Sequence, residues 1–482
     1  MKRLPPLLAV LLGILPFAAA GAGATDDTGL LQVTAVIDVR STVSDGDHDF
    51  DQLAALARQH GIEAIFVSDH DRLVLEYGLF PFRKIVKKRE ERPSVATVGA
   101  GEYLRRVRAA GERWPDVLFI PGVEAAPFYY WTGLPLVGDG LVAHQWERHL
   151  LVFGLDAEGL AGLPVLHNDH GSLRIDRQPP FLILFVLTGL IGVVALGWGG
   201  RFRLAGLLLL LFSLLLGQND LRPGVSRFDQ YHGEQGAAPW QECIDRVAAG
   251  GGLSFWNHPE TNSGRRPLGP IRLDTPSYPE MLERNTGYTG FAAIYGDRTT
   301  TTEPGGLWDG LLLQYCRGER QRPPTAIAVA DFHREGKDGE VLGNFATVLL
   351  AREKSGRALL DALSAGRAYA LRGHGRDRDL LREFSVTAAD GATAAIGGRL
   401  AVADSTPALI RAMVDHGGGD PHPIRLRLIR NGEVIAETDG VTPFRWQVTD
   451  RQRPPGAGFY RLEATGPRTR ILANPVFVVP DD

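Results

Sequence analysis

Short apolar segments that end in polar residues recur between residues 31 and 330. They are Leu31–Val39, Ala64–Ser68, Val117–Ile120, Leu150–Phe153, Leu253–Trp256, Phe291–Ile294 and Ala326–Ala330. Stretches with helical spacing of apolar residues lie between or after them, such as Phe50–His60, Trp240–Ala249, Leu307–Tyr315 and Arg357–Ser364. Near-continuous apolar strands that alternate with helices predict a parallel α/β sheet or barrel.

The rhythm changes near Arg382, where strand-like segments follow one another closely. They are Glu383–Thr387, Ile424–Ile429, Glu433–Thr438, Phe444–Val448 and Phe459–Ala464. Asn431-Gly432 lies between two of them and is a typical hairpin turn. The pattern predicts an all-β sandwich over residues 383–482, close to the ~100 residues usual for such domains.

Two uncharged apolar runs interrupt the α/β pattern. Phe181–Trp198 and Leu204–Gly217 carry no charge, and a short segment with Arg201 and Arg203 joins them. We predict a transmembrane helical hairpin over residues 178–219, with a pair of fully buried helices as the alternative. Arginines in a short loop favour the cytoplasmic side, so both flanks of the hairpin are expected outside.

The N-terminus agrees with this topology. A basic start, Met1 to Arg3, precedes the apolar run Leu7–Leu15 and the small residues Ala18–Ala24. This order is typical of a secretory signal peptide, here residues 1–24, and the alternative is an uncleaved anchor. We therefore expect an inner-membrane protein whose catalytic domain lies in the periplasm.

Charge and cysteine content exclude two classes of partner. The 482 residues carry 52 Lys and Arg against 56 Asp and Glu, a formal net charge of −4, which provides no basic surface for nucleic acid. Cys243 and Cys316 are too few for a sulfur-ligated zinc site. Whether they form a disulfide stays open.

An imidazole or carboxylate stands beside almost every predicted barrel strand. The set comprises Asp38 and Asp45 after the first strand, His70 after the second, Glu124 after the third, His149 at the start of the fourth, His258 after the fifth, and Asp331 and His333 after the last. Strand ends converge at one mouth of a barrel, and His, Asp and Glu without Cys suit Zn²⁺, Mn²⁺ or Fe²⁺. A single residue of this kind more often has only a structural role, as a hydrogen-bond partner. The prediction of a metal site therefore rests on the recurrence of such residues beside successive strands.

The same residues resemble the PHP (polymerase and histidinol phosphatase) metallohydrolases. The resemblance lies in Ser44-Asp45-Gly46, Ser68-Asp69-His70-Asp71, Gly122-Val123-Glu124, Asn257-His258-Pro259, Asp331-Phe332-His333 and the closing stretch Asp361–Tyr369. It implies a distorted (β/α)7 TIM-like barrel in two parts, residues 28–177 and 220–375, and metal-dependent hydrolysis of a small phosphoester substrate. A related branch, similar to carbaryl hydrolase, cleaves amide or carbamate bonds. The tail resembles the C-terminal β-domain of exported members.

The resemblance also implies a set of ligands. One group corresponds to Glu124, His149 and His258, and another to Asp45, His70 and His333, with Glu124 as the bridging ligand of two divalent ions. The family's third metal takes an H-x-H motif, which here is Asp38-Val39-Arg40. Arg40 cannot ligate a metal because a guanidinium has no lone pair to give.

Two interpretations of Arg40 follow. In the first, Arg40 replaces the third metal, neutralises Asp38 and Asp331, and contacts the substrate together with Arg298. In the second, the enzyme has decayed into a binding module. The sequence thus predicts an exported, membrane-tethered metal-dependent phosphoesterase, with Arg40 and Glu124 in catalytic roles, and leaves a non-catalytic binding protein as the alternative class.

Overall fold

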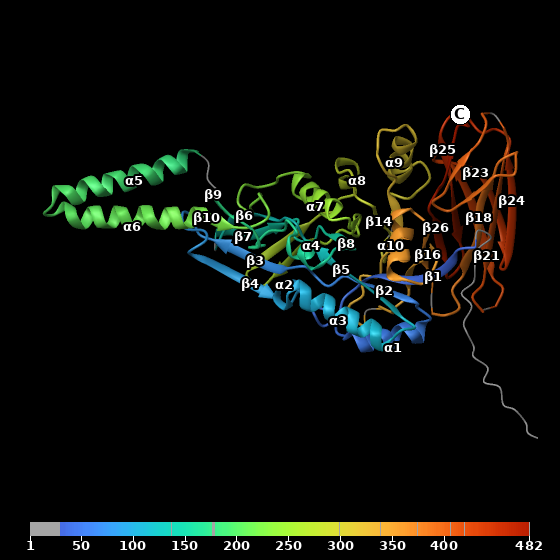
Figure 1. The fold of residues 1–482 in the computed structure, drawn as a ribbon, viewed down its shortest axis with the longest axis horizontal. Helices are drawn as coiled ribbons and strands as arrows, with labels where there is room; N and C mark the ends of the chain where they lie inside the picture. Colours follow the sequence, from blue (N-terminus) through green and yellow to red (C-terminus); the bar gives the residue numbers. More distant parts are fainter. Residues whose placement is uncertain are drawn as a thin grey trace, which may run out of the picture.

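The computed structural model describes residues 29–481 apart from residues 136, 176–178, 298, 338, 374, 405 and 419. The predicted signal peptide and Arg298 therefore lie outside the described residues. Figure 1 shows an elongated molecule with a helical hairpin at one end and a group of β-strands at the other. The central part between them holds the predicted α/β region.

Seven neighbouring strands, called the central strands here, form one side of the largest sheet. They are β15 (Thr325–Ala328), β14 (Gly290–Ile294), β11 (Leu253–Trp256), β8 (Leu150–Phe153), β5 (Leu118–Ala125), β2 (Ala64–Val67) and β1 (Leu31–Val39), in spatial order. All pairs are parallel except those of β8, which runs antiparallel to β5 and to β11. The prediction of a parallel sheet is wrong at β8. The chain segment between β5 and β8 starts and finishes at the same end of the sheet, so β8 runs in the opposite direction to β5.

The two outer strands of this set are joined at one end. Ala330 N–H donates to the Ile37 carbonyl at 2.8 Å, and Phe332 N–H donates to the Asp38 carbonyl at 3.0 Å. Beyond β1 the sheet continues through the antiparallel strands β16 (Phe345–Ala351) and β17 (Ala368–Arg372). Segments more than 280 residues apart are thus brought together where the predicted ligands lie.

Both faces of the central strands are buried. Ala35 and Ile37 of β1 belong to one apolar cluster, whereas Val36 and Val39 belong to another. This alternation explains why the strands are apolar at successive positions. The helices of the region are α1 (Phe50–His60), α2 (Val95–Val98), α3 (Ala100–Arg113), α4 (Ala157–Ala161), α7 (Ala238–Ala249), α8 (Met281–Arg284), α9 (Leu307–Cys316) and α10 (Gly356–Ser364).

Extra β-hairpins follow three of the central strands at the end where the predicted ligands lie. β3 (Leu73–Gly78) pairs with β4 (Lys87–Arg92), and a four-stranded sheet holds β6 (Tyr130–Leu134), β7 (Val137–His144), β12 (Gly264–Leu268) and β13 (Ile271–Thr275). In Figure 1 these strands lie between the central sheet and the helical hairpin. The end of the sheet with the predicted ligands therefore faces the hairpin.

The hairpin consists of α5 (Pro179–Trp198) and α6 (Phe202–Asp220), with the small pair β9 (Leu173–Ile175) and β10 (Leu221–Pro223) at its foot. By length and composition, α6 is long and apolar enough to cross a membrane, and Leu182–Trp198 is a shorter apolar helix. Most leucines of the hairpin are exposed, with Leu204 and Leu214 about two-thirds exposed, whereas Leu216 is buried. The alternative of two buried helices therefore does not describe this hairpin.

The C-terminal strands form a second β-rich unit. They are β18 (Leu380–Thr387), β19 (Thr393–Ala395), β20 (Arg399–Ala401), β21 (Ala408–Asp415), β22 (Pro423–Arg430), β23 (Glu433–Val441), β24 (Phe444–Asp450), β25 (Gly458–Thr465), β26 (Arg470–Ala473) and β27 (Val476–Val479). β26 pairs with β17, so the central sheet runs on into this unit. Arg461 and Asp309, both buried, also join the two parts through a bidentate ion pair at 2.6 and 2.8 Å. Cys243 and Cys316 are both free thiols.

Candidate metal centre

Every predicted ligand lies at the same end of the central sheet. All except Asp38 line a cleft of about 710 Å³, and Asp38 is fully buried. His149 reaches this end because β8 is antiparallel and begins where the parallel strands finish. The structure thus brings together eight residues that are spread from position 38 to position 333.

The backbone is strained at three of the strand ends. Asp38, His258 and Asp331 have φ angles of 71°, 27° and 46°, in the left-handed region that side chains disfavour. At Asp38 the β1–β2 register slips by one residue, between Ile37 and Val39. Such strain persists only where surrounding bonds over-determine the conformation, and it is frequent at active sites.

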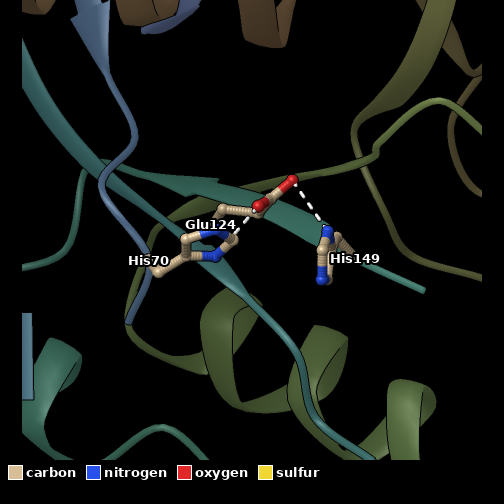
Figure 2. A group of neighbouring side chains, drawn as sticks. All are labelled: His70, Glu124 and His149. Atoms are coloured by element: carbon tan, nitrogen blue, oxygen red, sulfur yellow. Dashed lines mark ion pairs between the residues drawn. The ribbon is translucent and has the colours of Figure 1, made fainter. Parts of the chain in front are cut away.

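Glu124 is the centre of one group (Figure 2). Its Oε1 lies 3.0 Å from His149 Nδ1 and 3.6 Å from His258 Nε2, and its Oε2 lies 3.1 Å from His70 Nδ1. Ligand atoms of His70, Glu124 and His149 all lie within 4.8 Å of one another. Residues of both predicted ligand groups therefore meet at one carboxylate.

Asp45 is the centre of the other group. Its Oδ2 lies 3.4 Å from His70 Nε2 and 3.6 Å from His333 Nε2, and 42% of its side chain is exposed. His70 thus contacts Asp45 through one ring nitrogen and Glu124 through the other. The loop of Asp45 depends on Gly46, where a Cβ would lie 2.6 Å from the backbone of Arg40.

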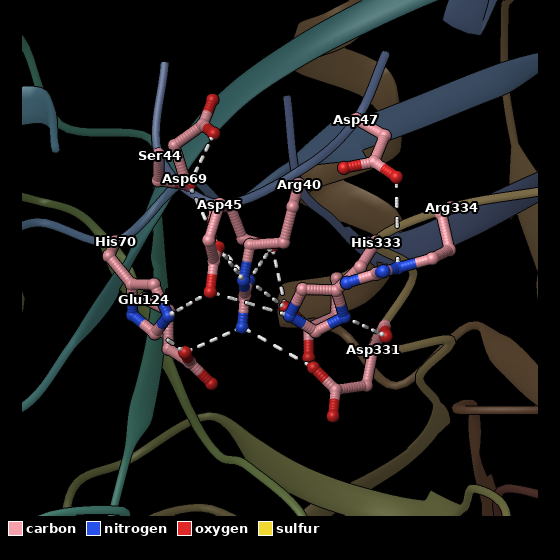
Figure 3. Close-up of polar contacts among 12 residues, drawn as sticks. Arg40, Ser44, Asp45, Asp47, Asp69, His70, Glu124, Asp331, His333 and Arg334 are labelled. Carbon is pink, nitrogen blue, oxygen red and sulfur yellow. Dashed lines mark hydrogen bonds and ion pairs between the residues drawn. The ribbon is translucent and has the colours of Figure 1, made fainter. Parts of the chain in front are cut away.

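Arg40 lies between the two groups (Figure 3). Its terminal nitrogens contact Asp38 Oδ1 and Glu124 Oε2, each at 2.5 Å, and its side chain is only 1% exposed. Asp331 is farther away, at 3.5 Å, and 48% of its side chain is exposed. The sequence predicted Asp38 and Asp331 as the partners of Arg40, whereas the two shortest ion pairs are with Asp38 and Glu124.

Three residues that the sequence reasoning did not single out complete the centre. Asn257 Nδ2 donates to Asp38 Oδ2 at 2.7 Å and to Glu124 Oε1 at 2.6 Å. Ser68 Oγ donates to Asp38, and Asp69 accepts bonds from the loop that carries Asp45. All three are buried polar residues within two positions of a predicted ligand, and they belong to the motifs quoted for the resemblance, although they were given no role there.

The carboxylates and imidazoles shift one another's pKa values. Burial alone would lower the pKa of His258, but its hydrogen bond to Glu124 and the nearby carboxylates raise it to about 9. Burial opposes the charge of Glu124, yet Arg40 and His149 hold its pKa well below the usual value. Burial raises the pKa of Asp38 more than Arg40 lowers it. Negative charge at this centre therefore favours cations.

The donor set fits a divalent ion. Nδ1 of His70 and Nδ1 of His149 are buried and have no hydrogen-bond partner in the described part of the chain. Each nonetheless points at Glu124 from within 3.1 Å. Imidazole nitrogens and carboxylate oxygens around one point are the ligands of Zn²⁺, Mn²⁺ or Fe²⁺.

No family model matches the chain, and no curated protein matches it in sequence. Among solved structures, a two-domain protein from Bacteroides vulgatus that contains a predicted PHP-like metal-dependent phosphoesterase is 13% identical, with a TM-score of 0.38 over 95% of this chain and 97% of the other. A proposed metal-dependent phosphoesterase from Bifidobacterium adolescentis is 16% identical, with a TM-score of 0.30 over 64% and 91%.

An amidohydrolase from Chromobacterium violaceum, solved with sulfate and without metal, is 15% identical, with a TM-score of 0.28 over 64% of this chain and 89% of the other. At such identities and TM-scores these likenesses support no conclusion about this chain, and both its fold and its activity are argued from its own elements and side chains.

Proposed function

We propose that the chain is a metal-dependent phosphoesterase built on a distorted (β/α)7-like barrel and held at the membrane by its helical hairpin. The observation that carries the proposal is the buried group of His70, Glu124 and His149 at the cleft. The Nδ1 atoms of His70 and His149 contact this carboxylate without making a hydrogen bond, and such buried nitrogens are costly unless something binds them.

The residues divide into two ligand groups. Glu124, His149 and His258 would hold one ion, Asp45, His70 and His333 would hold a second, and the two carboxylates face each other across His70. Bound divalent ions would supply a water of lowered pKa and stabilise negative charge on the group that is cleaved.

The protein's own residues prepare this site. Arg40 and Asn257 bond both Asp38 and Glu124, so they hold the Glu124 carboxylate in one orientation. Arg40 has both terminal nitrogens on protein carboxylates, which makes it a positioning residue for Glu124. Its direct contact with the substrate, like that of Arg298, stays a prediction.

Two further arginines favour a phosphoester over an amide or carbamate. Arg92 and Arg372 are exposed and line the same cleft as the ligands. Guanidinium groups bind the oxygens of a phosphate through paired hydrogen bonds, whereas a neutral amide offers them no charge. The substrate is therefore proposed to be a small phosphoester.

Metal analysis and a substrate panel test the proposal. Purified wild-type protein should contain about two equivalents of Mn, Fe or Zn, and it should hydrolyse phosphomonoesters or phosphodiesters in preference to amides. Removing the metal with a chelator should abolish the activity, and Mn²⁺ or Zn²⁺ should restore it.

Glu124→Gln should lower the metal content and the rate, by about a hundredfold or more if the group acts electrostatically. Glu319→Gln, a surface carboxylate paired with Arg317, is the matched control and should change neither. Wild-type protein that holds no metal and hydrolyses nothing would support the alternative of a binding module.

A further inference from the structure

A second cavity lies at the foot of the helical hairpin, away from the metal centre. Its volume is about 540 Å³, and it is lined by the tip of β3–β4, by residues 165–169 and by the segment that leaves α6. Asn219, near the end of α6, fixes this junction: its Oδ1 accepts from Lys84 N–H at 2.8 Å, and its Nδ2 donates to the Pro81 carbonyl at 3.2 Å. The cavity is thus built where the hairpin meets the body of the protein.

A ring of exposed apolar side chains surrounds this junction. We call it the apolar collar; it comprises Leu79, Phe80, Ile85, Val86, Leu173, Ile175 and Leu221. Phe80 is 66% exposed and Leu173 is 69% exposed. The collar is continuous with the hairpin, because Phe82 packs against Phe212 of α6 with ring centres 5.5 Å apart. If the hairpin crosses a bilayer, the collar meets its surface and the cavity lies at the depth of the lipid headgroups.

The cavity has a mixed lining and carries an arginine whose Nε donor is unused. Arg83 stacks on the Tyr231 ring at 4.0 Å, and its buried Nε has no hydrogen-bond partner within the described residues. Lys87 and Arg89 also line the cavity and share one carboxylate, Glu76, at 2.8 and 3.4 Å. Over the whole lining, the five basic residues Arg83, Lys84, Lys87, Arg89 and Arg222 stand against the four acidic residues Glu76, Asp169, Asp220 and Asp229. The cavity therefore keeps an excess of one positive charge for an anion, with the stacked guanidinium of Arg83 as its donor.

We propose that this cavity binds the phosphodiester headgroup of an anionic membrane phospholipid, with its acyl chains against the apolar collar. The proposal rests on membrane insertion of the hairpin, which is part of the proposed function. A free phosphate would use the cations but would leave the collar and most of the cavity volume empty. An amphipathic phospholipid fits both parts, since basic residues beside an apolar surface recognise anionic headgroups.

Such a lipid would also orient the metal centre. β3 and β4 pair from Leu73–Arg92, which line the metal cleft, to Gly78–Lys87, next to the headgroup cavity. At ~3.4 Å per residue this ribbon is roughly 20 Å long. The cleft would therefore open near the membrane surface, on the side that the lipid holds.

Binding can be measured on the full chain in an uncharged maltoside detergent. The probes are dihexanoyl phosphatidylglycerol, dihexanoyl phosphatidylcholine, glycerol phosphate and inorganic phosphate, and the readout is the unfolding temperature at increasing probe concentration. We expect a saturable rise with phosphatidylglycerol, a weaker rise with phosphatidylcholine, and none with the two water-soluble phosphates. No rise with phosphatidylglycerol in the wild type would overturn the proposal.

Variants then locate the site. Arg83→Gln should weaken phosphatidylglycerol binding by about tenfold or more, the usual effect of losing a charged hydrogen-bond donor. Lys88→Gln is the matched control: Lys88 lies on the same β3–β4 ribbon, pairs with Glu90 and does not line the cavity. This variant should bind phosphatidylglycerol as tightly as the wild type. Equal losses in both variants, or an equal rise with inorganic phosphate, would contradict a lipid site here.

The outcome can be separated from that of the proposed function. Arg83→Gln should keep its metal content and its hydrolysis of soluble phosphoesters, because Arg83 does not line the metal cleft. Loss of lipid binding with full hydrolysis supports both proposals. Lipid binding without any metal or hydrolysis would support the headgroup site and remove the phosphoesterase.

Discussion

Arg40 shows how a single residue can change a metal centre. A guanidinium stays protonated at every physiological pH. Arg40 therefore offsets the negative charge of Asp38 and Glu124 without a bound metal ion. The Asp38 carboxyl is fully buried and also accepts bonds from Ser68 and Asn257. Two carboxylates bonded to the same guanidinium are strongly disfavoured without a cation, which supports the hypothesis that Arg40 takes the place of a third metal.

The first prediction concerns this charge balance. Arg40→Ala leaves Asp38 and Glu124 buried without their cation, and we expect a loss of about 3–5 kcal/mol in the free energy of unfolding at neutral pH. Added Mn²⁺ should raise the unfolding temperature of the variant more than that of the wild type, because an ion can take the vacated position.

The double variant Asp38→His/Arg40→His extends the test. It restores an H-x-H motif, and elemental analysis should find about one more metal equivalent than in the wild type. Unchanged stoichiometry in the double variant, together with no extra Mn²⁺ effect in Arg40→Ala, would show that Arg40 does not stand for a metal. Loss of the H-x-H motif through decay of the enzyme would then better explain Asp38-Val39-Arg40.

His167 makes a second residue-scale prediction, on pH. Burial, with the charges of Arg72, Lys87, Arg89 and Arg222, lowers its pKa to about 3, while Glu76 Oε1 at 3.9 Å opposes them. Below its ordinary pKa of about 6.5 the unfolded chain takes up a proton that the folded chain refuses, so stability falls as the pH drops from about 6.5 toward 3. At pH 5 the cost is about 2 kcal/mol.

The measurement is the unfolding temperature of wild type and His167→Gln between pH 7 and pH 5. Gln keeps a polar partner for Tyr129, whose hydroxyl lies 2.9 Å from His167 Nε2, but it does not titrate. The wild type should lose more stability than the variant over this range. Parallel pH profiles would mean that His167 is protonated in the folded protein.

At the scale of elements, the packing of α5 against α6 depends on glycine. A Cβ at Gly206 would lie 2.7 Å from the Gly192 carbonyl oxygen and 2.7 Å from the Leu196 nitrogen, so the two backbones cross in close contact. Ser213 adds an interhelical bond to the Phe185 carbonyl at 3.0 Å. Small residues at a crossing are typical of helices that pack in a bilayer.

We therefore predict that Gly206→Ala separates the helices and costs about 1–3 kcal/mol, the usual penalty of overpacking. Gly197→Ala is the matched control, because a Cβ at Gly197 meets nothing within 4 Å. Thermal unfolding and protease cleavage in the turn between the helices report the difference. Equal behaviour of the two variants would show that the helices adjust without cost.

At the scale of the whole molecule, the hairpin, the central sheet and the β-rich unit follow one another along its length (Figure 1). The cleft is lined by Leu73 and Arg92, at the end of the β3–β4 ribbon that meets the central sheet. This ribbon lies on the hairpin side of the sheet, and β18 to β27 lie at the far end of the molecule (Figure 1). If the hairpin is anchored, the cleft is therefore close to the membrane and the β-rich unit is far from it.

The prediction at this scale is topology. A reporter that is active only in the periplasm should be active when fused after Gly217 and inactive when fused in the turn of Arg201 and Arg203, since arginines in a short loop stay in the cytoplasm. Replacing both arginines by glutamine should weaken this preference. A fusion after Gly217 that works only in the cytoplasm would reverse the proposed orientation.

Sequence alone determined what depends on local pattern. The seven central strands and the helices α1, α7, α9 and α10 follow from apolar periodicity, whereas β4, with the sequence KKREER, shows none and was not predicted. The predicted ligands follow from polar residues at strand ends, such as His70 and Glu124. The hairpin is a compositional feature, and its apolar runs lie within α5 and α6.

Only the tertiary structure decided what depends on contacts between distant segments. The antiparallel direction of β8 is set by the path of the chain between β5 and β8, which periodicity does not report. The short pairing of Arg40 with Glu124, and the bridge that Asn257 makes between Asp38 and Glu124, join residues up to 219 positions apart. The cavity at the foot of the hairpin likewise exists only because β3–β4 folds against α6, and no local pattern encodes that distance.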